Sequence, residues 1–154
     1  MLFEPDKLAE SDIDKLMKSA YVFTLVDEIC FQAISKSTLA LKMMKKWIEK
    51  DDETYGRGGW ALACSLITQN VLTKSEIEIL LSDIEAKMKD SLLLKQEVMN
   101  RCLCEIGIKY EDYTEKCIKL GEKLEVYKGQ KVSKGCTSSY APEWISVGIM
   151  KRKK

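Results

Sequence analysis

The sequence predicts an all-α protein, and three observations support this fold class. Apolar residues recur at helical spacing along nearly the whole chain of 154 residues, and no strand-like alternation runs longer than four residues. Only 2 prolines and 8 glycines interrupt the pattern. With 45% hydrophobic and 32% charged residues, the composition is that of a globular domain rather than a disordered chain.

Seven helical segments are expected before a loop-rich C-terminal segment. They span residues 11–18, 21–35, 39–49, 55–69, 75–89, 92–106 and 111–124. The second segment carries an apolar stripe at i, i+3, i+4 and i+7 spacing, the pattern of one buried helix face. Start and stop signals flank several segments: Ser11, Ser37 or Thr38, the capping box Thr73–Glu76, and Gly107.

The helices are arranged in successive pairs, 39–49 with 55–69 and 75–89 with 92–106. The spacing between pairs is about 36–37 residues, close to the shorter periods of two-helix solenoids. We therefore expect a HEAT-like helical-repeat solenoid. A compact helical bundle is the alternative, because the pairs share little sequence identity.

Two regions of the chain differ in charge. Residues 127–154 carry seven Lys or Arg and one acid, Glu143, whereas residues 1–126 have a net charge of −5. We expect a helical-repeat domain over 1–126 and, over 127–154, a basic loop and a short helix around 142–147 packed on it. The basic segment is either a handle for phosphate groups or a solubilising terminus, and charge alone does not decide between them.

Composition excludes several classes of site. The chain has no histidine, so imidazole-dependent catalysis and His-ligated zinc are excluded. Among the six cysteines the only close pair is Cys102 and Cys104, a spacing that does not suit zinc. We expect buried reduced thiols, no metal and no cofactor. No apolar run approaches the roughly 20 residues of a membrane span, and the acidic start does not resemble a secretory signal, so a cytoplasmic location is expected.

Two polar residues on apolar helices are candidates for function. Asp27 lies four residues after Phe23, which places a carboxylate beside an aromatic ring on one helix surface. The alternative is an aspartate at the edge of the core. Arg57 stands among Gly56, Gly58 and Gly59 at the start of a helix, where a phosphate or another backbone can approach closely. It either contacts phosphate or pairs with an acid such as Asp27.

The order and spacing of four segments resemble the DNA alkylation repair proteins of the AlkD-like, HEAT-like-repeat superfamily. The ten-residue step from Trp47 to Arg57 and the aromatic-x₃-Asp of Phe23 and Asp27 match the motifs of that family. The resemblance covers nearly all of this chain but only about the C-terminal two-thirds of a usual member. The segments are FTLVDEIC (23–30), WIEKDDETYGRGGW (47–60), EVMNRCLCEIG (97–107) and VSKGCTSSYAPEWI (132–145).

The resemblance implies a DNA glycosylase that removes cationic N3- or N7-alkylpurines from double-stranded DNA without flipping the base. It implies that Asp27 is the catalytic carboxylate, which stabilises the sugar cation, and that Arg57 contacts DNA. Phe23 stands where active relatives carry tryptophan. Arg101 stands approximately where they carry a second one, and we expect both residues to contact DNA.

Two other functions remain open at this stage. The chain could be a non-catalytic helical-repeat module that binds the DNA backbone or a protein partner. It could also be a structural domain that forms a homo-oligomer through an uncovered helix face. Release of alkylated bases would distinguish the glycosylase from these two alternatives. A steep salt dependence of duplex binding without base release would identify the DNA-binding module.

Overall fold

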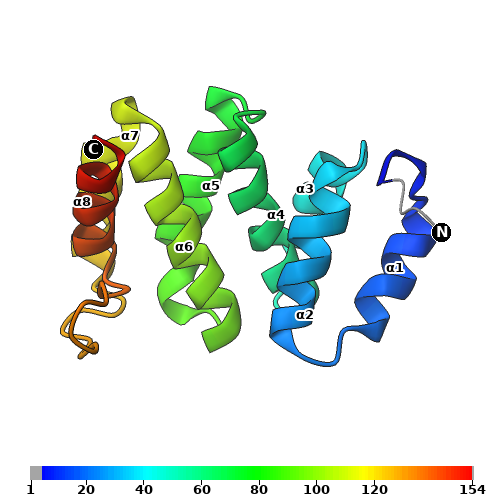
Figure 1. The fold of residues 1–154 in the computed structure, drawn as a ribbon, viewed down its shortest axis with the longest axis horizontal. Coiled ribbons are helices and arrows are strands. Elements are labelled where there is room, and N and C mark those ends of the chain that lie inside the picture. Colours follow the sequence, from blue (N-terminus) through cyan, green and yellow to red (C-terminus); the bar gives the residue numbers. More distant parts are fainter. Residues whose placement is uncertain (1–4, 154) are drawn as a thin grey trace. The chain divides into compact units, whose positions relative to one another are not determined.

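In the computed structural model, which describes residues 5–153, the chain is built from helices joined by turns and one longer loop (Figure 1). Within these residues there are eight α-helices and no strand, which confirms the all-α prediction. Their bounds are α1 Glu10–Ser19, α2 Phe23–Glu28, α3 Ala40–Trp47, α4 Tyr55–Gln69, α5 Lys74–Lys87, α6 Leu93–Lys109, α7 Glu111–Leu124 and α8 Ala141–Arg152.

The helices fall into two compact units. Unit 1 contains the chain up to Asn70 together with Leu92–Val98, and unit 2 contains Val71–Ser91 and the chain from Met99 onward. Helix α6 starts in unit 1 and continues into unit 2. The basic segment beyond residue 126 belongs to the same unit as α5 and α7. The division of the chain into 1–126 and 127–154, which rests on charge, stays a prediction.

Helices α3 and α4 of unit 1 pack with their backbones in close contact. A Cβ atom at Gly59 would lie only 2.5 Å from the backbone nitrogen of Ile48, so glycine is required at this position. Trp47 of α3 and Trp60 of α4 are almost completely buried. The glycine cluster at the start of α4 therefore serves helix packing, and the backbone that approaches Gly59 is that of α3.

The predicted second helix, 21–35, is only partly regular. The α-helical part, α2, is followed by a π-helical turn, η2 Ile29–Ala33, and a 3₁₀ turn, η3 Ile34–Lys36. In a regular α-helix every fourth residue advances roughly 40° beyond one full turn. The wider π turn offsets this drift, which is consistent with the burial of Val26, Cys30 and Ile34. Apolar spacing in the sequence does not distinguish these two kinds of turn.

The helix starts agree with the predictions in one case and differ in two. The capping box before α5 is confirmed, since the Thr73 hydroxyl accepts a hydrogen bond from the Glu76 N–H. Helix α1 begins earlier than expected, with Ala9 as its N-cap and Asp12 accepting the Ala9 N–H, so Ser11 lies inside the first turn. Helix α3 has Leu39 as its N-cap rather than Ser37 or Thr38.

Gly107 does not end α6 as expected. The helix continues to Lys109, and Gly107 faces neighbouring helices of unit 2. A Cβ atom there would lie 2.8 Å from Cδ1 of Ile145 and 2.9 Å from Cβ of Cys117. The glycine is therefore a close-packing residue. Helix α8 is also longer than the predicted 142–147, and near its end Arg152 donates hydrogen bonds to the last carbonyl oxygens of α6.

Helices α5 and α7 of unit 2 run in the same direction, and ion pairs join them at a constant distance in sequence. Lys74 pairs with Asp112, Glu78 with Lys116 and Glu85 with Lys123, each pair 38 residues apart. We call these three pairs the α5–α7 ladder. A fixed offset between parallel helices is expected of a two-helix repeat, and its length is close to the spacing predicted from the sequence.

Candidate functional site

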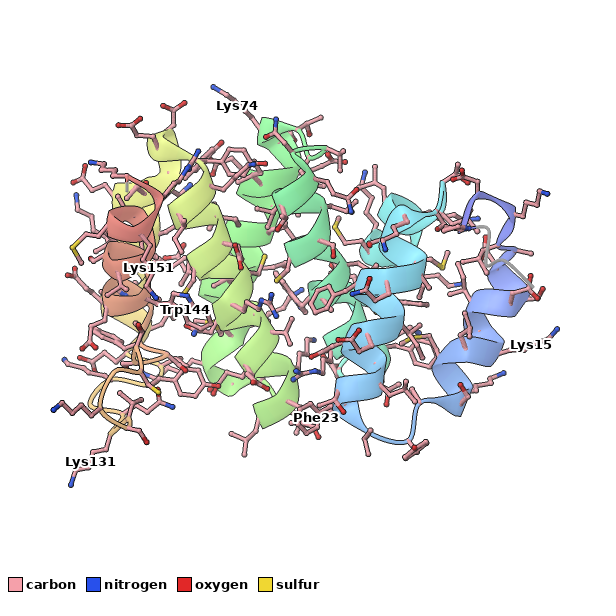
Figure 2. The ribbon with its side chains drawn as sticks, viewed as in Figure 1. Lys15, Phe23, Lys74, Lys131, Trp144 and Lys151 are labelled. Atoms are coloured by element: carbon pink, nitrogen blue, oxygen red, sulfur yellow. The ribbon has the colours of Figure 1, made fainter. Side chains whose placement is uncertain are left out.

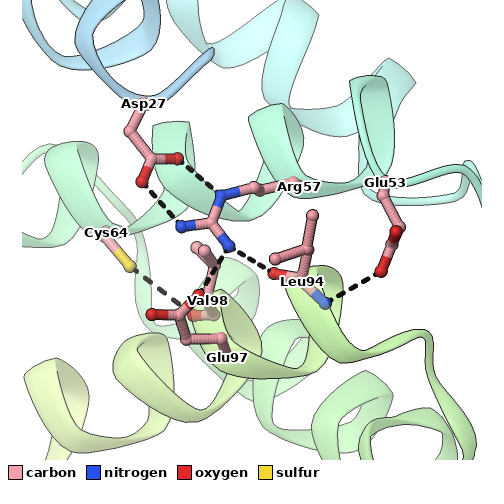
Figure 3. A network of polar contacts seen from close by, with 7 residues as sticks. All are labelled: Asp27, Glu53, Arg57, Cys64, Leu94, Glu97 and Val98. Carbon is pink, nitrogen blue, oxygen red and sulfur yellow. Dashed lines mark hydrogen bonds and ion pairs between the residues drawn. The ribbon is translucent and has the colours of Figure 1, made fainter. Parts of the chain in front are cut away.

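The candidate site lies in unit 1, around the guanidinium of Arg57 in the first turn of α4. The Arg57 side chain is 3% exposed. Its Nε donates to Oδ1 of Asp27 at 2.8 Å, and its Nη2 donates to Oδ2 of the same carboxylate at 2.7 Å. Figure 3 shows the two parallel hydrogen bonds between α2 and α4. This bidentate geometry fixes both side chains.

The opposite edge of the guanidinium faces α6. Arg57 Nη1 donates to the carbonyl oxygen of Leu94 at 2.6 Å and to Oε2 of Glu97 at 2.8 Å. Burial by itself would lower the pKa of Arg57, but the hydrogen bonds to Asp27 and Glu97 outweigh it and raise that pKa above its ordinary value. Arg57 is thus a fixed cation that joins α2, α4 and the part of α6 that belongs to unit 1.

The aromatic ring of Phe23 completes the cluster. Cζ of Arg57 lies 4.8 Å from the ring centroid of Phe23, within the range of a cation–π interaction. The Phe23 residue is 41% exposed. Figure 2 shows it at the end of α2 that lies beside the start of α6.

Further contacts hold the starts of α4 and α6 together. Asp52 accepts the backbone N–H groups of Thr54 and Tyr55, so it fixes the entry into α4. Glu53 accepts the Leu94 N–H at 2.9 Å at the start of α6. The Lys95 ammonium, whose side chain is buried, donates to the carbonyl oxygen of Lys50 at 2.6 Å. These contacts leave little freedom for the backbone around Arg57.

The structure brings together three of the four residues singled out in the sequence. Asp27, Phe23 and Arg57 form one cluster around the guanidinium. Arg101 belongs to unit 2, where it is exposed and its Nε lies 3.8 Å from Oε1 of Glu105. Arg57 faces carboxylates rather than solvent, which corresponds to the alternative of an arginine paired with Asp27.

Sequence reasoning missed the α6 side of the site. Glu97 begins a segment that was noted for its family resemblance, but its proximity to Arg57 depends on how α6 packs against α4. The Leu94 carbonyl oxygen is a backbone group, so no side-chain pattern identifies it. Two unlike charges spaced about one repeat apart, Arg57 and Glu97, are the only signal that could have suggested the contact.

The charge of the cluster limits its chemistry. Asp27 and Glu97 contribute two negative charges, and Arg57 contributes one positive charge at their centre. Both oxygens of Asp27 accept hydrogen bonds from Arg57, and the carboxylate remains 18% exposed. Asp27 can therefore approach a ligand only as half of an ion pair, and the aromatic ring of Phe23 stands more open to solvent.

Metal-binding groups do not accompany this cluster. Among residues 5–153 no three His, Cys, Asp or Glu side chains are grouped so as to hold a metal ion. Five of the six cysteines are buried as expected, and Cys136 is exposed. Burial raises the pKa of Cys117 to about 12 and also raises that of Cys30. In the described part of the chain no helix is both long and apolar enough to span a bilayer.

Comparison with known proteins points to one family. The family model described as "DNA alkylation repair enzyme" matches residues 4–145. No curated protein matches the chain. One solved structure, reported as "A new family of proteins related to the HEAT-like repeat DNA glycosylases with affinity for branched DNA structures", has a TM-score of 0.81 and 26% sequence identity. The match covers 97% of this chain and 65% of that one. The fold is therefore HEAT-like, as expected from the helix pairs.

Proposed function

This chain belongs to the DNA alkylation repair enzyme family, and on that premise we propose that it binds DNA, with a preference for branched structures, and does not excise bases. One observation carries the second part of the proposal. Both oxygens of the Asp27 carboxylate accept hydrogen bonds from the buried Arg57 guanidinium. A preference for branched DNA is suggested by the similar solved protein, which is reported to have that affinity.

The Asp27 ion pair is a poor arrangement for glycosidic bond cleavage. The leaving of a base makes the sugar cationic, and a nearby carboxylate accelerates the step by stabilising that charge. Here the carboxylate already faces a full positive charge at hydrogen-bond distance. Since Arg57 repels a sugar cation about as strongly as Asp27 attracts it, the pair offers little net stabilisation. Release of alkylated bases from duplex DNA is the second candidate, favoured by the residual exposure of Asp27 beside Phe23.

We assign phosphate binding to the basic residues 127–154 of unit 2 rather than to Arg57. Residues 127–154 carry a net charge of +6, and Lys128, Lys131, Lys134, Lys151 and Lys153 are exposed. Figure 2 shows Lys131 projecting from the loop before α8. Lysines of this kind bind phosphates regardless of sequence and release counterions as they do so. Arg101, exposed on α6, is a further candidate contact.

A binding assay and a base-release assay test the proposal together. Fluorescence anisotropy should show tighter binding to a three-way junction than to a linear duplex of equal length and charge. Replacing Lys131 and Lys134 by Gln should weaken binding to both DNAs. It should also make the slope of log K against log salt shallower by roughly 0.9 for each phosphate that is no longer neutralised.

The base-release arm uses duplex DNA that contains N7-methylguanine and N3-methyladenine. We expect no release above a buffer control. Release that is abolished by Asp27→Asn would contradict the proposal and establish the glycosylase. Equal affinity for junction and linear duplex would contradict the branched-DNA preference. Absence of any DNA binding would contradict the proposal and favour binding of a protein partner.

A further inference from the structure

We propose that exposed apolar side chains at the starts of α2 and α6 form a wedge that enters a DNA branch point and stacks against the end faces of the base pairs exposed there. The wedge consists of Tyr21, Val22, Phe23, Leu92 and Leu93, all in unit 1. The inference rests on the proposed function, because it names the surface through which this chain would recognise branched DNA.

The two halves of the wedge are held side by side. Arg57 lies against the Phe23 ring on one side and bonds the Leu94 carbonyl oxygen on the other, so one buried cation joins the starts of α2 and α6. In Figure 1 these two helix ends lie at the same edge of unit 1. Tyr21 is 86% exposed and Leu93 is 76% exposed, which makes them the most prominent side chains of the surface.

An apolar surface of this kind needs an explanation. Five large side chains at such exposures present on the order of 600 Å², the upper end of what a monomeric protein usually shows. Isolated exposed apolar residues are ordinary, but these five are contiguous in two short runs at one place. A standard protein interface buries roughly 800 Å² per partner, of which little more than half is apolar, so area alone does not choose between bases and a second copy of this chain.

The neighbouring charges favour bases over the DNA backbone. Glu97 and Asp27 lie directly beside the wedge, and Arg57 neutralises only one of these two carboxylates. Phosphates would be repelled at this place. The face of a base is uncharged, and aromatic side chains stack on any base without reading its sequence. The wedge therefore suits the interior of a DNA helix more than its surface.

A branch point exposes what a continuous duplex hides. Where strands exchange partners the base stack is interrupted, and the end faces of base pairs become accessible. Leucine and aromatic wedges are known to insert between base steps, at the cost of unstacking them. At a junction that cost is largely absent, so an apolar wedge adds affinity for branched DNA and none for linear DNA. The fixed hydrogen bonds of Arg57 keep the wedge in place before binding.

The test compares junction preference in wedge variants. Tyr21→Ala combined with Leu93→Ala should reduce affinity for a three-way junction by at least about tenfold and leave affinity for the matched linear duplex unchanged. Tyr21→Trp should retain junction affinity, since it keeps a stacking ring. Ile79→Ala is the matched control, because it removes an exposed apolar side chain from unit 2 and should change neither affinity.

A second measurement reports base contact directly. With 2-aminopurine at the branch point, wild-type protein should change its fluorescence on binding, and the double variant should not. Unchanged junction affinity and an unchanged signal in the double variant would overturn the wedge, even if wild type prefers junctions as proposed. Wild type without junction preference would overturn the proposed function and the wedge with it. A wild-type dimer in sedimentation that the double variant abolishes, without any effect on DNA binding, would assign the surface to self-association instead.

Discussion

Replacing Arg57 by Met should destabilise the protein by about 3 kcal/mol. Breaking a buried ion pair by removing one partner typically costs about 3–5 kcal/mol, because the other charge is left without compensation. The lower end of that range applies here, since Asp27 is 18% exposed and water can reach it. The Leu94 carbonyl oxygen also loses its partner. The lost ion pair with Glu97 adds little to this destabilisation, because the Glu97 side chain is 55% exposed.

Urea unfolding followed by circular dichroism measures this loss. With a slope of about 2 kcal/mol per M for a chain of this size, the midpoint should fall by roughly 1.5 M. The control is Lys119→Met, which breaks the exposed pair with Glu115 and should move the midpoint by less than about 0.3 M. A second substitution, Asp27→Asn in the Arg57→Met background, should recover part of the loss because it removes the uncompensated carboxylate.

Two results would refute this reasoning. If Arg57→Met and Lys119→Met shift the midpoint equally, the Arg57 cluster contributes no more than a surface pair. If Asp27→Asn destabilises the Arg57→Met protein further, the charge of Asp27 is not the source of the loss.

Four other expectations can be checked on the same protein. Gly59→Ala should lower stability by about 2 kcal/mol or more, measured in urea, because the added methyl would meet the backbone of α3 at 2.5 Å. A thiol reagent at neutral pH should label Cys136 quickly and Cys117 only after unfolding, since burial raises the pKa of Cys117 to about 12. The free energy of unfolding should also fall as pH rises from about 9 towards 12, because in that range the Cys117 thiol ionises only in the unfolded chain. The hydrogen bond from Lys123 lowers the pKa of Glu85, so Lys123→Gln should raise that pKa in an NMR titration, and an unchanged value would contradict the pairing.

Apolar periodicity without a named cap residue predicted two helices well, since the segments 55–69 and 111–124 agree with α4 and α7. The capping box at Thr73 correctly marks the start of α5. The errors come from tertiary contacts. Gly107 has the local properties of a helix stop, yet it sits inside α6 because neighbouring side chains leave no room for a Cβ atom there. The π turn after α2 has no local signal.

The site was predictable in its members and not in its geometry. Asp27 and Phe23 share a helix surface, so their proximity follows from spacing. Contact between Asp27 and Arg57 was one of two alternatives, and nothing in the sequence shows that the Arg57 side chain is 3% exposed. Burial of a charged side chain depends on which helices surround it, and the third helix, with Glu97, comes from about one repeat further along the chain.

The α5–α7 ladder constrains how these two helices can align. If α7 slid by one helical turn in one direction along α5, Lys74 would face Lys116, and a slip in the other direction would bring Glu78 opposite Asp112. Either slip replaces an attraction by a repulsion, whereas apolar residues between the helices would tolerate it better. Charge therefore favours one alignment of α7 along α5 over the alignments one turn away.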